Sequence, residues 1–399
     1  MPWKESRLFK DFTKVGHPAT LISAFLYFTI HCMIWVLVGV LGVFIANEFD
    51  LTASQKGLMV AAPILTGSLL RIPVGILADQ FGAKKTGTVI QILVLLPLLG
   101  GWLVADSLAG VIAVGLLLGF AGASFTVAIP LASRWYPLEH QGLVNGIAGA
   151  GNIGAVLAAL VAPRLAEVVG WRQVFGLALL PVLLTLAMSH WLAKESPNRP
   201  APKRWSESLK ILQESDCCWF SLFYAITFGG FVGLASFLVI FFYDQYGLSR
   251  VMAGNMAALC VLAGSLFRPV GGYLADRMGG VQLLSILFGA IGVLTAGVGL
   301  LPPLPVTTAL LFLAMAAMGL GNGAIFQVIP QRFRSEIGVA TGIVGTAGGI
   351  GGFFLPLLLG LLKDLTGSYG TGLLLFALAS LAAVVALQSL RTGWQASWL

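Results

Sequence analysis

The segments GSLLRIPVGILADQFG at residues 67–82 and GSLFRPVGGYLADRMG at residues 264–279 are two copies of one pattern. An arginine, two glycines and an aspartate keep the same spacing in both copies. The second copy begins 197 residues after the first (264 less 67), close to half of the 399-residue chain. The similarity extends to Gly119, Phe125, Pro130 and Arg134 against Gly319, Phe326, Pro330 and Arg334, with shifts of a few residues. A repeat of this length predicts two structurally related halves.

The composition is that of an integral membrane protein. Hydrophobic residues make up 58% of the chain, charged residues only 10%, and the mean hydropathy is +0.93. These values exclude a soluble enzyme, a secreted disulfide scaffold, a disordered chain and a nucleic-acid binder. The four cysteines lie in or beside apolar stretches without metal-ligand spacing, so we expect buried thiols and neither a metal site nor a cofactor: Cys32, Cys217, Cys218 and Cys260.

Twelve apolar runs are each long enough to cross about 30 Å of hydrocarbon as a helix. Their approximate bounds are 20–46, 57–78, 86–105, 108–131, 142–163, 174–193, 217–243, 251–275, 282–301, 306–328, 338–362 and 370–390. The first run is too long for a signal-peptide core, so it is expected to stay as a span. An all-α fold of two six-helix bundles follows, at residues 1–193 and 217–399, with a polar linker at 194–216 in which a surface helix is expected at 205–213.

The loop charges predict the orientation in the membrane. Most of the 23 lysines and arginines fall at the termini or in loops on the terminus side, beginning with Lys4, Arg7, Lys10 and Lys14. Because cytoplasmic loops are enriched in basic residues, both termini are predicted to be cytoplasmic, in a multi-pass protein of the plasma (cell inner) membrane. Two arginines, Arg71 and Arg268, fit no loop.

These two arginines lie inside predicted spans, whereas all 16 acidic residues fall in termini, loops or span ends. Arg71 precedes Asp79, at the end of its span, by eight residues, or about 12 Å of helix. Burying an arginine there costs at least about 2.5–3.5 kcal/mol, so it needs an anionic partner. A planar oxyanion substrate matches the flat guanidinium fork. The alternative is that both arginines bond only backbone carbonyls.

The repeated segment resembles the signature of the major facilitator superfamily. The matching residues are Gly75, Asp79, Gly82, Lys84 and Lys85, echoed by Gly272, Asp276 and Gly279. The resemblance covers the whole chain and implies alternating access between two rocking bundles, with this motif bracing helices on the cytoplasmic side. A carboxylate at a helix end can hold a neighbouring helix through charged hydrogen bonds. The alternative is an ordinary solvated turn.

Two glycine-rich stretches narrow the resemblance further. GLVNGIAGAGNIGAVLAALVAP at residues 142–163 and GVATGIVGTAGGIGGFFLPLLLG at residues 338–360 resemble the paired signatures of the nitrate/nitrite porter family. Their glycines allow close helix packing, and those expected to matter are Gly149, Gly151, Gly154, Gly345, Gly348 and Gly351. The second stretch has Gly349 where the first has Asn152, so an asymmetric site is expected.

The resemblance implies that the paired arginines grip the anion. It also implies an asparagine of the fifth span and aromatics of the seventh, which are Asn152, Tyr224 and Phe228 here, with Phe125 as a weaker candidate. An amide and a phenol can donate to nitrate oxygens, and a ring can cover the flat face of the anion. Ordinary packing is the alternative for each aromatic, and a helix–helix hydrogen bond is the alternative for Asn152.

The predicted function is transport of nitrate and nitrite across the membrane by exchange, serving nitrate transport and assimilation. The partners are a small inorganic anion and the lipid bilayer, and the protein is expected to be monomeric. Proton-coupled symport is the main competing hypothesis, with His31 or His190 as proton carrier, although packing or a helix-end position explains both histidines. The sequence also leaves open a carrier of cyanate, formate or organic phosphate, a channel, a membrane enzyme, or a sensor that does not transport.

Overall fold

The computed structural model describes residues 16–197, 210–333 and 337–397. These residues include twelve helical segments long and apolar enough to cross a membrane, which confirms the expected all-α architecture. The first six spans comprise α2 (Pro18–Trp35), α3 (Leu37–Val40), α4 (Gly42–Glu48), α5 (Ala53–Phe81), α6 (Ala83–Leu103), α7 (Leu108–Gly122), α8 (Phe125–Ser133), α9 (Leu138–Gly149), η1 (Ala150–Asn152), α10 (Ile153–Val169) and α11 (Trp171–Leu192). The last six comprise α13 (Ser215–Tyr224), η3 (Ala225–Gly229), α14 (Gly230–Tyr246), α15 (Arg250–Met278), α16 (Gly280–Gly299), α17 (Leu304–Arg332), α18 (Ile337–Thr366) and α19 (Gly370–Ser397).

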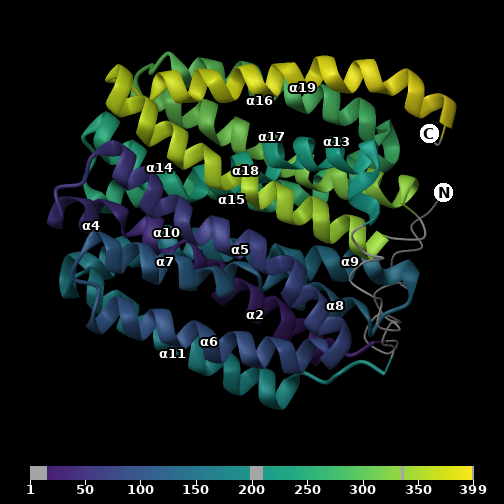
Figure 1. Ribbon diagram of the computed structural model, residues 1–399, viewed down its shortest axis with the longest axis horizontal. Coiled ribbons are helices and arrows are strands. Elements are labelled where there is room, and N and C mark those ends of the chain that lie inside the picture. The colour runs from purple at the N-terminus through teal and green to yellow at the C-terminus, as the bar shows by residue number, and fades with distance from the viewer. Residues whose placement is uncertain (1–15, 198–209, 334–336, 398–399) are drawn as a thin grey trace.

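The spans form two groups that lie side by side, the first six in the lower part of Figure 1 and the last six in the upper part. We call them the N half (residues 16–193) and the C half (residues 217–397). The start of α2 and the end of α19 lie at one end of the bundle, which we call the terminal face; the other end is the distal face. Of the predicted surface helix, only the 3-10 turn η2 (Lys210–Gln213) lies within the described residues, and Lys4, Arg7, Lys10 and Lys14 lie outside them.

Four spans that the sequence predicts as continuous helices are interrupted. The run 20–46 breaks at Val36 and Leu41, and the run 108–131 breaks just before Phe125. The run 142–163 contains the 3-10 turn η1, and the run 217–243 contains the π-helical turn η3. Hydrophobic length reports whether a segment can cross the membrane, but it does not report the local hydrogen-bonding register, so the sequence missed these breaks.

The repeated motif ends a long helix in each half. Gly82 (φ +102°) terminates α5, and its counterpart Gly279 (φ +86°) terminates α15. Only glycine adopts this backbone conformation without strain, which explains why both copies carry it.

The two halves are joined mainly by α5 against α18 and by α10 against α15, and the surface of the bundle is apolar. Large hydrophobic side chains such as Leu96, Leu180, Val293 and Leu378 are exposed on it, as expected for a surface in contact with lipid.

The cysteines lie mostly where the sequence predicts them. Cys32, Cys217 and Cys260 are buried as expected, but Cys218 is exposed on α13, which corrects the prediction for that residue. Cys217 and Cys218 are consecutive in a helix, so their side chains point in different directions and only one of them can face the interior.

Candidate functional site

Arg71 is deeply buried where the two halves meet. Its side chain leaves α5 and is only 4% exposed. Its Nη1 donates a hydrogen bond of 2.7 Å to the carbonyl oxygen of Gly345, on α18 of the C half. Its Cζ lies 4.8 Å from the ring centroid of Phe228 and 5.6 Å from that of Trp35. The Nε–H has no partner among the described residues, so part of the guanidinium remains available to a ligand.

Arg268 occupies the matching position in the C half, on α15, and is half-buried. Its Cζ lies 5.3 Å from the ring centroid of Phe125 and 5.6 Å from that of Phe326. Each arginine therefore faces one aromatic ring of its own half and one of the other half. Aromatic faces are electron-rich and attract a guanidinium, so they hold the cation in place without neutralising it.

Tyr224 links the two arginines. It is 1% exposed, interacts electrostatically with both Arg71 and Arg268, and precedes the π-helical turn η3. Its ring stacks on Phe228 at 5.0 Å with an interplanar angle of 6°, and it meets the edge of Phe326 at 5.1 Å. The two arginines are close enough to repel each other. Among the described residues, no carboxylate forms an ion pair with either, so the predicted positive charge inside the bundle is present.

The alternative hypothesis was that both arginines bond only backbone carbonyls, and the structure differs between the two. Arg71 does bond a backbone carbonyl, but that carbonyl belongs to the opposite half and accepts from only one nitrogen. Arg268 is held by two rings and by its interaction with Tyr224. Neither environment supplies the negative charge that a buried guanidinium requires.

Asn152 ends the 3-10 turn η1, which packs mainly against α2 and also touches α15, the helix of Arg268. It is 5% exposed, and its backbone carbonyl accepts a weak hydrogen bond from the thiol of Cys32. Its side-chain amide bonds neither arginine in this conformation. The alternative role in a helix–helix hydrogen bond is likewise not seen for this amide within the described residues.

The signature glycines differ in what surrounds them. A Cβ at Gly151 would lie 2.5 Å from Phe28, and one at Gly154 would lie 1.9 Å from the carbonyl oxygen of Thr29. In the second signature, a Cβ at Gly348 would lie 2.2 Å from the ring of Tyr224, and one at Gly351 would lie 2.6 Å from Ala225. These four glycines let helices approach closely.

Two signature glycines depart from the expectation of close packing. Gly149 has open space beside it, and a Cβ at Gly345 would meet only Arg71, at 4.0 Å. The structure also explains why the second signature lacks an asparagine. A Cβ at Gly349 would lie 1.9 Å from the hydroxyl of Ser68 on α5, so a side chain at this position would have to displace Ser68.

At the terminal face, the first copy of the family motif joins elements of the N half. Asp79 pairs with Arg134 at the end of α8, as expected for a bracing carboxylate. Glu195 accepts hydrogen bonds from the backbone N–H groups of Ala83 and Lys84 and so caps α6. These contacts are specific and buried in part, which argues against an ordinary solvated turn.

The lysines and the second copy of the motif are less constrained. The Lys84 ammonium donates to the carbonyl of His190, which is exposed at the end of α11, while Lys85 is exposed. In the second copy, Asp276 is exposed, and the predicted counterpart of Arg134, which is Arg334, lies outside the described residues.

The inner glycine of each motif copy lies against a neighbouring helix. A Cβ at Gly75 would lie 3.9 Å from Thr126, and one at Gly272 would lie 3.9 Å from the carbonyl oxygen of Gly323. Both are ordinary contact distances, so these two positions have room for a small side chain.

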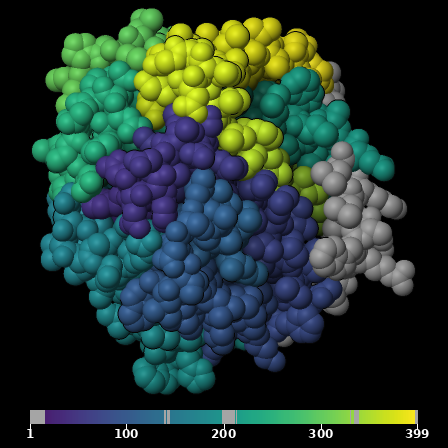
Figure 2. Space-filling model, turned by 60° about the vertical axis from the view of Figure 1, so that its left-hand side comes forward, coloured from purple at the N-terminus to yellow at the C-terminus, as the bar shows by residue number. Residues whose placement is uncertain are grey.

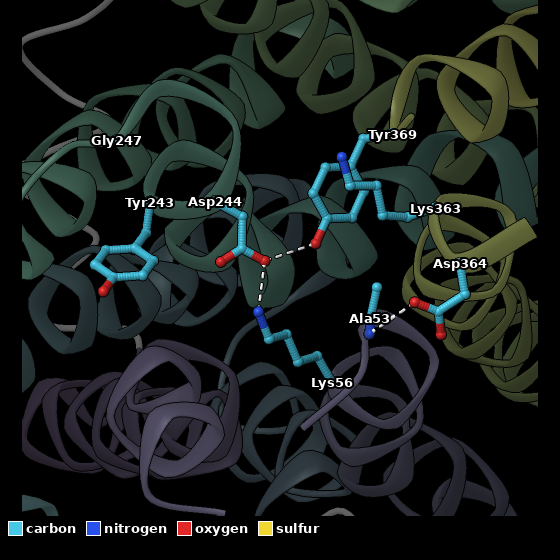
Figure 3. Close-up of a pocket in the computed structure, with 8 residues that line it drawn as sticks. All are labelled: Ala53, Lys56, Tyr243, Asp244, Gly247, Lys363, Asp364 and Tyr369. Atoms are coloured by element: carbon cyan, nitrogen blue, oxygen red, sulfur yellow. Dashed lines mark hydrogen bonds and ion pairs between the residues drawn. The ribbon is translucent and has the colours of Figure 1, made fainter. Parts of the chain in front are cut away.

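Ionic and hydrogen-bonded contacts between the halves concentrate at the distal face (Figure 3). Lys56 of the N half lies 2.7 Å from Asp244 of the C half, and the hydroxyl of Tyr369 donates to the same carboxylate at 2.8 Å. Asp364 accepts hydrogen bonds from the backbone N–H groups of Ala53 (3.0 Å) and Ser54 (2.8 Å) and thereby caps α5 across the interface.

A pocket of about 630 Å³ lies among these distal residues, and Figure 3 shows its lining. Its α5 residues, Ala53 and Lys56, lie at the opposite end of the helix from the middle part that carries Arg71, and we regard the pocket as part of the distal face rather than the anion site. Figure 2 turns this face toward the viewer, where the purple atoms of the first spans lie against the yellow-green atoms of α18. Nearer the terminal face, by contrast, Gly146, Gly149 and Gly342 have open space beside them. The ion pair and the helix cap that join the halves therefore lie on the distal side.

Sequence reasoning missed two aromatic residues of this site. Phe326 is the repeat counterpart of Phe125, so the repeat could have identified it. Trp35 lies in the middle of the first span, whereas tryptophan is ordinarily enriched at membrane interfaces. This unusual depth was the signal in the sequence that could have marked Trp35 as a site residue. His31 is fully buried, and its Nδ1 lies 2.7 Å from the carbonyl oxygen of Tyr27, in agreement with a packed residue.

Comparisons with known proteins agree with this architecture. The profile of the Major Facilitator Superfamily matches residues 23–356. The chain is 36% identical over 355 residues to the nitrite extrusion protein of Bacillus subtilis (strain 168), covering 88% of this chain and 89% of that protein. It is 34% identical over 393 residues to a probable nitrate/nitrite antiporter, NarK1, of Thermus thermophilus, covering 90% and 88%. The solved structure of a D-xylose–proton symporter has the same fold, with a TM-score of 0.75 at 16% identity over 92% of this chain and 96% of that one.

Proposed function

Because this chain belongs to the major facilitator superfamily and, within it, to the nitrate/nitrite porters, we propose that it exchanges nitrate for nitrite by alternating access. It is a multi-pass plasma-membrane protein, a secondary transporter of nitrate and nitrite rather than an enzyme. The observation that carries the exchange proposal is the pair of arginines inside the bundle, each between two aromatic rings, with no carboxylate to neutralise them among the described residues.

The site residues support a planar oxyanion as substrate. Arg71 and Arg268 offer forked donors from opposite halves, and the phenol of Tyr224 lies in the field of both. The rings of Phe125 and Phe326 lie beside Arg268, with their centroids 5.3 and 5.6 Å from its Cζ. We propose that Asn152 joins these donors once an anion is bound, since its amide bonds neither arginine now.

We assign the terminal face to the cytoplasm because most basic loop residues lie there. With this orientation, the distal contacts of Lys56 with Asp244 and of Asp364 with α5 would close the carrier toward the outside. We further propose that residues 1–193 and 217–399 move as two bodies joined by the linker 194–216, within a monomer. The motif around Asp79 would keep the N half rigid while the halves rock.

The charge of the site suggests why the carrier would exchange rather than leak. The two guanidinium groups repel each other electrostatically, which opposes full closure around an empty site. A bound anion removes this penalty, so only the loaded carrier reorients readily. Nitrate then enters, the halves rock, and nitrite leaves by the reverse path.

The test is nitrate uptake by purified protein in liposomes that contain either nitrite or an inert salt, without a pH gradient. We expect saturable uptake only with internal nitrite. Uptake that ignores internal nitrite but follows an inward proton gradient would establish symport instead. Failure of unlabelled nitrate to compete, where cyanate or formate does, would overturn the substrate assignment.

The distal contacts lead to a second expected result. Replacing Asp364 with alanine removes the cap that joins the two halves at α5. A helix cap stabilises by about 1–2 kcal/mol, so the population open at the distal face should rise about tenfold. Spin labels on Val168 and Leu300, exposed residues of different halves, would report this as a longer distance in pulsed electron resonance, once the exposed Cys218 has been replaced.

The matched control is Asp106→Ala. Asp106 is an exposed carboxylate whose partner, Arg172, belongs to the same half, so its loss should leave the interlabel distance unchanged. Equal distance distributions in the Asp364 variant and the wild type would contradict a closing role for this contact.

A further inference from the structure

Trp35 ends α2 deep inside the N half, where the chain turns at Val36. It is 4% exposed, and its Nε1–H donates a hydrogen bond of 2.7 Å to the carbonyl oxygen of Pro63 on α5. A buried indole N–H requires an acceptor, and this bond orients the ring relative to the helix that carries Arg71.

Two glycines make the space that the indole occupies. A Cβ at Gly67 on α5 would lie 2.7 Å from Nε1 of Trp35, and one at Gly122 on α7 would lie 2.4 Å from the same atom. No other residue at either position would leave room for the ring in this pose. Three elements of the N half, α2, α5 and α7, therefore fix the indole in one place.

The fixed ring lies against Arg71, with the arginine Cζ 5.6 Å from its centroid. The other two supports of Arg71, the ring of Phe228 and the carbonyl of Gly345, belong to the C half. When the halves rock as separate bodies, contacts between them must change, whereas contacts within one half persist. Trp35 is the ring that accompanies Arg71 through the whole cycle.

We infer that Trp35 is a positioning residue that holds the Arg71 guanidinium in its anion-binding orientation in both orientations of the carrier. The inference rests on the proposed function, in which Arg71 binds nitrate. Trp35 contacts the arginine through its ring face and contributes no hydrogen bond to the anion, because its only side-chain N–H is given to Pro63.

The test compares Trp35→Leu, which removes the ring, with Trp35→Phe, which keeps a ring but loses the hydrogen bond. Nitrate affinity is measured by titration calorimetry on purified protein, and KM and kcat by exchange in liposomes. A desolvated cation–π contact predicts a rise in Kd and KM of about tenfold for Trp35→Leu. The phenylalanine variant should recover affinity to within about threefold of the wild type.

Trp171→Leu is the matched control. Trp171 is also a buried tryptophan of the N half whose Nε1 donates a hydrogen bond, in this case to Glu48 near the distal face. Its loss should lower the melting temperature without changing the nitrate Kd of the folded protein. A purely structural role for Trp35 would give that same result.

The outcomes distinguish the positioning role of Trp35 from the proposed transport function. An unchanged nitrate Kd in Trp35→Leu, or an equal rise in Trp171→Leu, would overturn the positioning role and leave the proposed function intact. A wild-type protein that binds no nitrate would overturn both.

A second variant keeps the test decisive if Trp35→Leu yields too little folded protein. Trp35→Met then replaces it, because methionine fills an irregular apolar space without supplying a ring. A nitrate Kd clearly higher in Trp35→Met than in Trp35→Phe supports the positioning role. Equal Kd values in these two variants would contradict it.

Discussion

Replacing Arg71 with lysine is expected to reduce kcat/KM for nitrate about 100-fold while leaving the protein folded. Lysine keeps the positive charge but loses the flat fork of donors and much of the contact with the rings of Trp35 and Phe228. Each charge-assisted hydrogen bond contributes about 1.5–3 kcal/mol, so the loss of one or two accounts for that factor. Exchange kinetics in liposomes measure it, and the melting temperature shows that the fold is retained.

Arg268→Lys should also reduce kcat/KM for nitrate, but by a smaller factor. Arg268 is half-buried and bonds no backbone carbonyl among the described residues, whereas Arg71 is 4% exposed and bonds Gly345 across the interface. Arg277→Lys is the control, since Arg277 lies on the same helix at the terminal face, exposed and over the ring of Tyr273. Wild-type KM in the Arg71 variant would contradict a forked contact with the anion.

Replacing Gly154 with alanine is expected to destabilise the protein so that most of it does not remain folded after mild heating. Its Cβ would lie 1.9 Å from the carbonyl oxygen of Thr29 and 2.8 Å from the backbone nitrogen of Met33, both on α2. Backbone atoms cannot rotate away as a side chain does, so α10 and α2 must separate. Overpacking of this kind costs about 1–3 kcal/mol or more. Size-exclusion chromatography after mild heating would measure the surviving fraction.

The control for this substitution comes from the same signature. Gly149 has ordinary helical backbone angles and open space where a Cβ would be, and alanine is the better helix former. Gly149→Ala should therefore fold as well as the wild type. Equal stability of the Gly149 and Gly154 variants would show that α10 and α2 do not approach as closely as described.

Much of the architecture could be read from the chain. Apolar length predicted twelve spans, because crossing a membrane requires long apolar helices whatever their packing. The repeat around Arg71 and Arg268 predicted two related halves. Charge also indicated the centre of the candidate site, because the free-energy cost of an arginine inside a span is high enough to suggest a functional role.

The rest of the candidate site depends on how the helices pack. The interruptions at Val36, before Phe125, at Asn152 and after Tyr224 each lie in or next to a residue of the site, and none shows as a loss of hydrophobicity.

The roles of individual glycines were equally hidden. Gly154 and Gly149 belong to one motif, yet only the first has a neighbouring backbone in contact. The difference arises because two positions of one helix can face a neighbouring helix or an open space, and residue type alone does not distinguish them.

Sequence alone thus established the number of spans and the buried positive charge, since both follow from the cost of placing a residue in hydrocarbon. It also established the two-fold repeat, since matching residues recur at a fixed offset. It could not establish that Trp35 supports Arg71 or that Gly345 accepts from Arg71 across the interface. Those contacts join residues of different helices. They depend on the distance and the rotation between helices, and a linear pattern of apolar residues specifies neither.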